Sequence, residues 1–504
     1  MEDNTPDPDP STASTTPDRS STPSAVRPPL TGSTVRHGGG SLLATYGLTA
    51  LALVLPGSSM CLLGRRKLGV PVLGFYLAGV ATLAYLLLER RAALLRAFVR
   101  PAWLTVTIVG LLIGFVCWAL VVTVSHLMAR PGGLTRVQRL GATSFLVLTC
   151  VALAVPFGVA IRYASAQRAF ISDVFRSAAG SNSATRPLGA TAADPWHGKD
   201  RVNVLLIGSD AGPEREGTRT DSMIVASIDV HTGNVVLFSL PRNLEHVPFP
   251  AGTPLHRLYP SGFTGPGDPL EWMLNAVYGK VPELHPGVLG KSDNEGADAL
   301  KLAISGALGI PIDYYVLVDL NGFVQLVDAM GGVTVNVDEP IPIGGVTGVR
   351  PPEGYISPGP DKHLDGYHAL WFARGRYGLD DYDRMRRQRC LMAAVIHRAD
   401  PITLLTHYAK ILDAGRKIIQ TDVPSELLPA FVDLALKVKD AKVRSVVFAR
   451  SNQFAPDSPD YHWVHSVVAK AIQTSGGGGN GGGGHRKHSL AQAPADACAY
   501  VPVS

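Results

Sequence analysis

The segment VNVLLIGSDAGPEREGTRTDSMIVASID spans residues 202–229 and contains two apolar runs separated by a polar stretch. The run at 202–208 is continuous and short, which is typical of a buried strand. The run at 222–228 is followed by the turn residues 231–234 and by a third apolar run at 235–240. These runs predict three strands, the last two of which form a β-hairpin.

Helix and strand patterns alternate further along the chain. Strands are predicted at 314–319 and 333–337. Helical spacing is found at 297–308, 322–330, 364–372 and 384–397. Gly309 and Pro311 follow the first of these helices and are typical stop signals. The alternation predicts a mixed α/β domain, with helices on both sides of a sheet, over residues 201–475.

Apolar stretches without a single Asp, Glu, Lys or Arg precede this domain. Each has about the length needed to cross a hydrocarbon core of roughly 30 Å, and lipid favours helices because every backbone group must be paired internally. Buried helices of a soluble protein are disfavoured, because short arginine-rich loops separate the stretches. We therefore expect residues 41–162 to form an all-helical membrane domain of about four transmembrane segments. These segments are 42–63, 68–88, 102–128 and 142–161.

The charges of the connecting loops leave the orientation open. Each of the three loops carries a net charge of +3, so the excess of positive charge in cytoplasmic loops cannot rank them. Four crossings would place residues 1–40 and the α/β domain on the same side of the membrane, either inside or outside. Alternatively, the first stretch, interrupted by Pro56-Gly57, only dips into the bilayer. Three crossings would then place the two ends on opposite sides.

The remaining segments are polar or rich in glycine. Residues 1–40 are dominated by Pro, Ser, Thr and Asp and are predicted to be disordered. A short juxtamembrane helix and a polar linker are expected over 163–200, and a flexible Gly-rich tail over 476–504.

The overall composition narrows the class of protein. The chain of 504 residues is 46% hydrophobic and only 17% charged, against about 25% in soluble domains, which argues against a purely soluble cytosolic protein. The net charge of +5 is too weak to indicate nucleic acid as a partner.

Carboxylates stand where two of the predicted strands end and begin. Asp210 closes the first strand and Asp221 opens the second. If these strands are neighbours, the two carboxylates meet at one sheet edge, and they suit a hard divalent cation such as Mg²⁺. The alternative is structural, with one residue in a turn and the other capping a strand.

Arginines form two further clusters. Arg242 directly follows a predicted strand, and residues 374–389 read RGRYGLDDYDRMRRQR. The planar guanidinium fork matches phosphate oxygens, so converging arginines favour a polyphosphate site. On a helix, Arg384, Arg387 and Gln388 share one face. A solvated surface with weak ion pairs is the alternative for 374–389. No GxxxxGK[ST] or GxGxxG nucleotide-binding loop occurs.

A series of motifs in this region resembles the LytR–CpsA–Psr family of membrane-anchored cell-envelope enzymes. The resemblance covers about residues 201–398, in the family's order, and the anchor resembles that of multi-pass actinobacterial members. The motifs are VNVLLIGSD, TRTDSMIVASID, VVLFSLPRN, IDYYVLVDLNGFVQLVDAMGGVTVNV, HLDGYHALWFARGRY and DYDRMRRQ.

The resemblance implies a phosphotransferase that moves a glycopolymer from a polyprenyl-pyrophosphate carrier onto peptidoglycan. The reaction would use Mg²⁺ or Mn²⁺ and take place outside the membrane, so the protein would be a multi-pass membrane protein with an extracytoplasmic catalytic domain. A deep apolar pocket would hold the polyprenyl chain. Candidate lining residues are Leu302, Ile304 and Phe323, with core packing as the alternative role of each. The rival hypotheses are a polyprenyl-pyrophosphate phosphatase and a non-catalytic envelope regulator.

Carried over motif by motif, the resemblance also implies roles for individual residues. Asp210 and Asp221 resemble the metal-associated carboxylates, and Asp381 is the candidate base for the acceptor hydroxyl. The residues expected around the pyrophosphate are Arg219, Arg242, Arg374, Arg376, Arg384, Arg387 and Gln388. The residues expected to be catalytic are Arg219, Asp221, Arg242, Arg374, Arg376 and Asp381.

The sequence departs from the family pattern in two places, and two of its cysteines lie outside the apolar stretches. Asn243 stands where the family usually has Asp, and residues 247–295 form a long segment, interpreted as a surface insertion or an acceptor-specific lid. Cys390 and Cys498 lie outside the apolar stretches and could form a disulfide in an oxidising compartment, or be free thiols.

Overall fold

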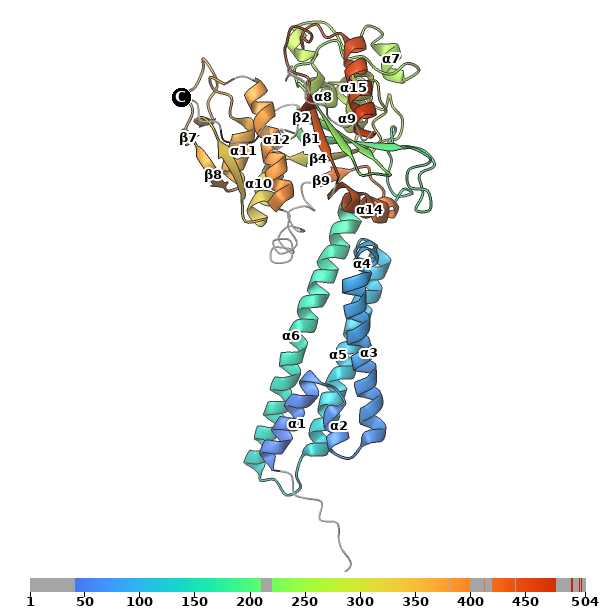
Figure 1. Cartoon of the computed structure of the whole chain (residues 1–504), viewed down its shortest axis with the longest axis vertical. Coiled ribbons are helices and arrows are strands. Elements are labelled where there is room, and N and C mark those ends of the chain that lie inside the picture. Colours follow the sequence, from blue (N-terminus) through green and yellow to red (C-terminus); the bar gives the residue numbers. More distant parts are fainter. Residues whose placement is uncertain are drawn as a thin grey trace, which may run out of the picture.

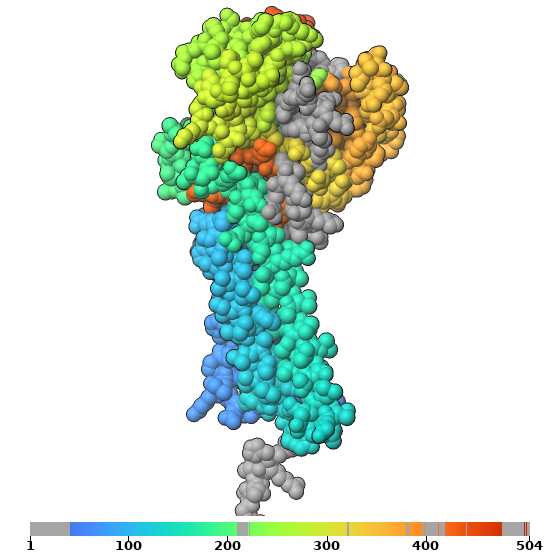
Figure 2. Space-filling model, turned by 180° about the vertical axis from the view of Figure 1, so that it is seen from behind, coloured from blue at the N-terminus to red at the C-terminus, as the bar shows by residue number. Residues whose placement is uncertain are grey.

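The computed structural model shows an elongated molecule, in which a stalk of helices carries an α/β head (Figure 1). The space-filling view from behind shows the same narrow stalk and broader head (Figure 2). The structure describes residues 41–209, 220–379, 381–398, 412, 419–439, 441–476, 491–492, 498 and 500.

Three helices of the stalk are long and apolar enough to cross a membrane within the described ranges: α3, α5 and α6. The last of these continues without a break to Val174, so the juxtamembrane helix expected after residue 162 is its continuation. The stalk consists of α1 (Leu42–Val54), α2 (Ser58–Leu62), α3 (Arg66–Glu89), α4 (Arg91–Phe98), α5 (Pro101–Ala129) and α6 (Arg136–Val174).

The fourth predicted span, residues 42–63, is not a continuous helix. Helix α1 has 13 residues and is therefore about 20 Å long, short of a hydrocarbon core of roughly 30 Å. The chain then reverses at Gly57, whose φ of +90° is accessible to glycine without strain, and returns as the five-residue α2. The structure therefore does not confirm four crossings. The broken segment corresponds to the three-crossing alternative.

Helices α1 and α2 pack against the neighbouring ends of α3 and α5. The Thr45 hydroxyl donates a hydrogen bond of 2.9 Å to the carbonyl of Ala129, and Thr49 Oγ1 lies 2.9 Å from Nδ1 of His126. A Cβ added to Gly57 would lie 2.6 Å from the carbonyl oxygen of Gly69 on α3. Figure 1 shows α1 and α2 beside each other in the half of the stalk remote from the head.

The head is built on a seven-stranded sheet in the order β11-β10-β3-β2-β1-β4-β9. Strand β1 pairs antiparallel with β2 and parallel with β4, while β3 completes the predicted hairpin with β2. The predicted strand 314–319 is confirmed as β4. The strands are β1 (Arg201–Ser209), β2 (Thr220–Asp229), β3 (Val235–Leu240), β4 (Tyr314–Asp319), β9 (Ile419–Thr421), β10 (Val443–Val447) and β11 (Ala491–Gln492).

Helices cover both faces of the sheet, which confirms the mixed α/β prediction. Because side chains alternate along a strand, Leu205 and Ile207 face the layer of α8, α9 and α15, while Val202 and Val204 face α14 and the stalk. The helices of these layers are α7 (Pro254–Leu258), α8 (Val277–Leu284), α9 (Glu295–Leu308), α14 (Leu428–Lys439) and α15 (Tyr461–Gly476), with the short 3-10 helices η1 (Pro269–Glu271), η2 (Leu274–Ala276) and η3 (Ser425–Leu427).

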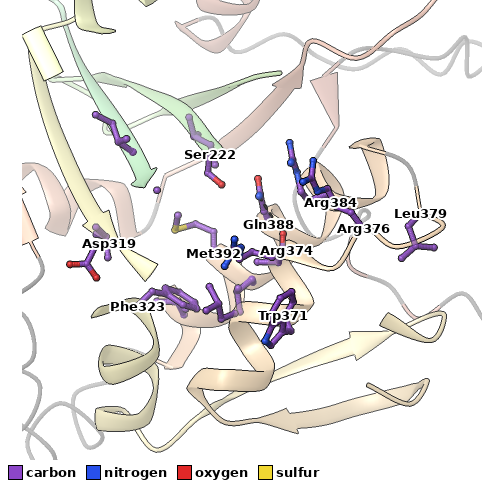
Figure 3. Close-up of a pocket in the computed structure, with 18 of the residues that line it drawn as sticks. Ser222, Asp319, Phe323, Trp371, Arg374, Arg376, Leu379, Arg384, Gln388 and Met392 are labelled. Carbon is purple, nitrogen blue, oxygen red and sulfur yellow. Dashed lines mark hydrogen bonds between the residues drawn. The ribbon is translucent and has the colours of Figure 1, made fainter. Parts of the chain in front are cut away.

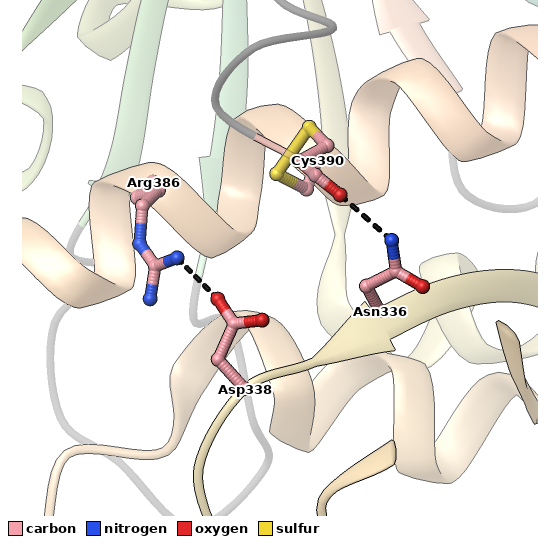
Figure 4. The surroundings of a disulfide bond; sticks show 5 residues. Asn336, Asp338, Arg386 and Cys390 are labelled. Carbon is pink, nitrogen blue, oxygen red and sulfur yellow. Dashed lines mark hydrogen bonds and ion pairs between the residues drawn. A yellow bond between two sulfur atoms is a disulfide. The ribbon is translucent and has the colours of Figure 1, made fainter. Parts of the chain in front are cut away.

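A smaller lobe with its own apolar core lies beside the carboxyl ends of β1 and β4. Its disulfide joins Cys390 to Cys498, and Asn336 Nδ2 donates a hydrogen bond of 2.9 Å to the carbonyl of Cys498 (Figure 4). Of the two alternatives that the sequence leaves open, a disulfide or two free thiols, the structure has the disulfide. The lobe contains α10 (Leu320–Ala329), β5 (Val333–Val337), β6 (Ile341–Ile343), β7 (Gly354–Ile356), β8 (Gly359–Leu364), α11 (Gly366–Arg374) and α12 (Asp381–Arg398).

The long segment 247–295 is part of the main core. Its aromatic rings Phe249, Tyr259, Phe263 and Trp272 are buried and pack against one another under α9. An ordinary surface insertion does not describe this segment, because its rings belong to the main core. The alternative role as an acceptor-specific lid stays a prediction.

The head is joined to the stalk by a shared apolar core and by polar contacts. Leu104 of α5 and Ile171 of α6 are buried together with Tyr314 of β4 and Leu434 of α14. The linker is attached as well, because Asp298 of α9 accepts hydrogen bonds from the hydroxyls and an amide of residues 183–185. These contacts fix the position of the head relative to the helices of the stalk.

Candidate active site

A cavity of about 780 Å³ lies between the sheet and the smaller lobe (Figure 3). Its walls come from β1, β2 and β4 on one side and from α10, α11, α12 and the loop 344–350 on the other. The lining residues are Leu206, Ile207, Gly208, Ser222, Ile224, Val316, Val318, Asp319, Phe323, Leu326, Gly344, Gly345, Val346, Thr347, Arg350, Leu370, Trp371, Ala373, Arg374, Arg376, Tyr377, Leu379, Arg384, Gln388, Leu391, Met392 and Val395.

Arginines from two chain segments meet in this cavity. Arg374 and Arg376 come from the end of α11 and the loop after it, whereas Arg384 and Gln388 come from one face of α12. Arg376 and Arg384 are grouped at one end of the view in Figure 3, with Phe323 and Asp319 at the other. Several guanidinium groups around one space are suited to hold a pyrophosphate.

Most of the remaining wall is apolar. This part of the wall includes Val316 and Val318 of β4, Phe323 of α10 and Met392 of α12. An apolar chain could therefore be removed from water beside the arginines, which is favourable by about 0.8 kcal/mol for each buried CH₂. Leu302 and Ile304, also named as candidate lining residues, lie in α9 and belong to the main core instead.

The sheet edge predicted to hold the carboxylates is formed as expected. Strands β1 and β2 are neighbours, and their register pairs Ser209 with Thr220 and Gly208 with Ser222. Asp210 and Arg219 lie outside the described residues. Asp221 is the second residue of β2, but its side chain is outside the described part of the chain. The contact predicted between the carboxylates of Asp210 and Asp221 therefore stays a prediction.

Arg242 follows β3 at this same edge of the sheet, since Leu240 pairs with Met223. Its carbonyl accepts a hydrogen bond of 3.0 Å from the amide of Asn275, and its side chain is not among the groups that line the cavity. Asp381 begins α12, and its side chain lies outside the described part.

Arg387 is buried but, unlike Arg384 of the same motif, does not line the cavity. Its guanidinium contacts the carbonyl oxygens at the end of α11, and Nη1 lies 3.8 Å from Oε1 of Glu339. Burial raises the pKa of Glu339, and the Asp383 carboxylate raises it further, while Arg387 and Arg386 oppose this shift.

Several lining residues were not singled out from the sequence. Ser222 and Asp319 stand at strand ends, as Asp210 and Asp221 do, so their position was a usable signal. The Arg374 guanidinium carbon lies over the Trp371 ring, 5.5 Å from the ring centre, and this contact limits the orientation of the guanidinium. Arg350 belongs to a glycine-rich loop between β6 and β7, and no local pattern marks it as a site residue.

The described residues alone do not form a metal site. No group of three or more His, Cys, Asp or Glu side chains lies close enough to hold an ion within the part of the chain that the structure describes. Asp319 and the hydroxyl of Ser222 are oxygen donors at the cavity wall and are compatible with a hard cation. The arrangement as a whole can hold a phosphorylated group with an apolar substituent.

Comparison with known proteins finds relatives of the head. Residues 170–475 match the LytR_cpsA_psr family. The chain is 30% identical over 236 residues to the polyisoprenyl-teichoic acid–peptidoglycan teichoic acid transferase TagU of Oceanobacillus iheyensis, a match that covers 46% of this chain and 61% of that protein.

A second relative has a different name. The chain is 30% identical over 230 residues to biofilm regulatory protein A of Streptococcus mutans, covering 44% of this chain and 50% of that protein. The chain thus spans half to three fifths of the length of these curated relatives. A crystal structure of the protein gbs0355 from Streptococcus agalactiae has a TM-score of 0.41 and 24% identity, covering 54% of this chain and 88% of that chain.

Proposed function

Because this chain belongs to the LytR_cpsA_psr family, we propose that its head is a phosphotransferase that moves a glycopolymer from a polyprenyl-pyrophosphate carrier onto peptidoglycan. The observation that carries this proposal is the cavity, in which four arginines (Arg350, Arg374, Arg376 and Arg384) adjoin an apolar wall. Such a space matches the two halves of a polyprenyl pyrophosphate, one charged and one apolar. The name of the TagU relative supports the same kind of substrate.

In the proposed reaction, Arg374, Arg376 and Arg384 hold the pyrophosphate and balance the charge that develops on it. A hydroxyl of the acceptor attacks the phosphorus next to the glycan and forms a phosphodiester. The bond from this phosphorus to the bridging oxygen breaks, and polyprenyl phosphate leaves with the bond electrons. Asp381, or a neighbouring carboxylate, is proposed to take the proton of the attacking hydroxyl.

Mg²⁺ or Mn²⁺ is proposed as the cofactor, with Asp210 and Asp221 as its carboxylate ligands. The pairing of Ser209 with Thr220 supports this proposal, because these two residues precede Asp210 and Asp221 in the sequence and lie together at one sheet edge. A bound divalent ion would supply positive charge beside the phosphate oxygens.

The test uses the full-length chain in detergent, since Leu104 and Ile171 of the stalk belong to the core beneath the head. The protein is incubated with a polyprenyl-pyrophosphate glycan and peptidoglycan fragments, with Mg²⁺ or with a chelator. We expect a metal-dependent phosphodiester product, lost in Arg376→Ala. Arg450→Ala is the matched control, because Arg450 is exposed and forms an ion pair with Asp457 away from the cavity lining.

The rival functions predict other outcomes of the same assay. Release of polyprenyl phosphate without a joined product would indicate a phosphatase. Lipid binding without turnover would indicate a regulatory protein, a role in keeping with the name of the Streptococcus mutans relative. Neither rival explains a glycan joined to peptidoglycan.

We also propose that the protein crosses the membrane three times, through α3, α5 and α6, with the head outside and residue 41 inside. Support comes from the length of α1 and from its hydrogen bonds to the end of α5 remote from the head. An epitope tag before residue 41 should resist protease in intact cells and become accessible after permeabilisation. Accessibility in intact cells, together with an exposed head, would establish four crossings.

A further inference from the structure

The side chain of Arg387 is only 3% exposed, although it belongs to the arginine-rich start of α12. Its Nε donates a hydrogen bond of 2.8 Å to the carbonyl of Phe372, and its Nη2 donates to the carbonyl of Gly375. Both acceptors lie at the end of α11. The guanidinium therefore contacts backbone and is not part of the cavity wall.

The end of α11 explains why an arginine is placed there. The last carbonyl groups of a helix have no partner within the helix and carry partial negative charge. A guanidinium fork can donate to two of them at once, which an ammonium group cannot do with the same planar geometry. Gln388, the next residue, adds a hydrogen bond of 3.3 Å to the carbonyl of Ala373.

The backbone held in this way carries two of the cavity arginines. Arg374 is the last residue of α11, Gly375 follows it, and Arg376 comes next. A Cβ on Gly375 would lie 2.6 Å from the carbonyl oxygen of Pro342 and 2.7 Å from Cγ2 of Ile341. The Gly375 backbone is thus enclosed by β6 on one side and by Arg387 on another.

We propose that Arg387 is a positioning residue, which directs Arg374 and Arg376 into the cavity by holding the backbone between Phe372 and Gly375. It does not itself contact the phosphate groups. This inference rests on the proposed function, because it assigns to Arg374 and Arg376 the binding of a pyrophosphate. Glu339, 3.8 Å from the Arg387 guanidinium, balances its buried charge.

A direct phosphate contact and a positioning role predict different results for Arg387→Lys. Lysine keeps the charge, so it would largely preserve a phosphate contact. It loses the forked contact with two carbonyls, so it would release the backbone of residues 375–379. We expect affinity for geranylgeranyl pyrophosphate, measured with the full-length protein in detergent, to fall about tenfold, a loss of about 1.4 kcal/mol.

A double-mutant cycle tests whether this loss passes through the two arginines. In an Arg374→Ala/Arg376→Ala background, the apolar chain of the lipid still supports binding, and Arg387→Lys should change the affinity less than about twofold. An equal tenfold loss in both backgrounds would mean that Arg387 acts on the ligand independently, and would overturn the inference.

Arg386→Lys is the matched control on the same helix. Arg386 Nη1 lies 2.5 Å from Oδ2 of Asp338, on the side of the disulfide and not of the cavity (Figure 4). Because lysine keeps the charge at this position and the Arg386 side chain is one-third exposed, the variant should bind the lipid within about twofold of the natural protein. A tenfold loss in this control would attribute the Arg387 effect to general disturbance of α12, against our inference.

Hydrogen–deuterium exchange gives a readout that needs no ligand. The amide of Gly375 donates a hydrogen bond of 2.7 Å to the carbonyl of Trp371, and Arg387→Lys should speed its exchange while α9 stays protected. Weaker binding with unchanged exchange at 375–379 would overturn the inference. If the natural protein binds no lipid pyrophosphate, the proposed function fails, and the exchange result still decides whether Arg387 holds this backbone.

A second variant covers the case in which Arg387→Lys does not fold. Glu339→Gln keeps an oxygen acceptor near Arg387 but removes the charge that balances the guanidinium. We expect faster exchange at Gly375 and a two- to threefold loss of lipid affinity, a smaller loss than for Arg387→Lys because the hydrogen bonds of Arg387 to the backbone remain. Unchanged exchange and affinity in this variant would contradict the role of the pair.

Discussion

The Lys301 ammonium lies 2.7 Å from Oδ2 of Asp422, and the two side chains are only 1% and 4% exposed. Lys301 also donates to the carbonyl of Asp313, and Oδ1 of Asp422 accepts from the amide of Tyr315. The pair therefore connects α9, the start of β4 and the residue after β9. These elements support the strand from which Val316 and Val318 enter the cavity.

Lys301→Met should destabilise the head strongly, because it removes the ammonium group that pairs with the buried Asp422 carboxylate. Removing one partner of such a pair typically costs about 3–5 kcal/mol. The melting temperature of the full-length protein in detergent measures this loss. Adding Asp422→Asn should recover part of it, whereas Arg450→Ala, at an exposed pair, should change little. A Lys301→Met variant as stable as the Arg450 control would show that the pair is not structurally important.

Cys498→Ser should lower the melting temperature, because the disulfide closes a loop between residues 108 positions apart. Chain entropy alone predicts a loss of at most about 4–5 kcal/mol for a loop of this size. A reductant should lower the melting temperature of the natural protein and leave that of the variant unchanged. The three other cysteines are not disulfide-bonded, so a thiol titration of the unreduced natural protein should find these three free thiols. Equal sensitivity of both proteins to reductant would contradict this assignment.

Strands with a clear boundary at both ends could be predicted from the sequence. The strand at 314–319 lies between Pro311 and a helical pattern, and the strand at 333–337 follows Gly331-Gly332, so both agree with the structure residue by residue. The first apolar stretch was harder, because composition cannot show that Gly57 reverses the chain. Hydropathy records that residues 42–63 are apolar, but not that they form two short helices.

In the candidate site too, the local sequence predicts some residues, while others depend on tertiary packing. Strand ends and arginine motifs pointed to Arg374, Arg376, Arg384 and Gln388, which the structure brings to one cavity. Helical periodicity grouped Arg387 with them, yet the end of α11 lies beside this position and binds its guanidinium. Spacing along one helix cannot reveal what a second helix places there. Arg350 was missed for a related reason, since its loop reaches the cavity only through tertiary packing.

The stabilisation of α11 by Asp365 should be lost at acid pH. As the N-cap of this helix, it accepts a hydrogen bond of 2.8 Å from the amide of His368. This bond holds the pKa of Asp365 below its usual value, against the opposing effect of burial and with help from the His368 ring. Because the pKa of Asp365 is lowered by folding, its stabilisation is complete at pH values above the ordinary carboxyl pKa. The stabilisation is lost as the pH falls through the pKa of the folded state.

The measurement is the melting temperature of the natural protein, Asp365→Asn and Asp365→Ala between neutral and strongly acid pH. Asparagine also caps helices, so Asp365→Asn should lose only the pH-dependent part, and its difference from the natural protein should vanish in acid. Asp365→Ala should lose about 1 kcal/mol at neutral pH. A difference that persists unchanged in acid would show that the carboxylate charge is not involved.

Met392→Trp should discriminate between lipids of different length. Met392 projects into the cavity between the sheet and α12 (Figure 3), so a larger ring there occupies space that an apolar chain would otherwise fill. Affinity for geranylgeranyl pyrophosphate should fall at least about tenfold, while geranyl pyrophosphate, which buries fewer CH₂ groups, should lose less than about twofold. Leu284→Trp is the control, because Leu284 is exposed on α8 and outside the lining of the cavity. Equal losses for both lipids would mean that the added ring disturbs the arginines of the cavity and not its apolar wall. No loss for either lipid would mean that the apolar chain of the lipid binds elsewhere on the protein.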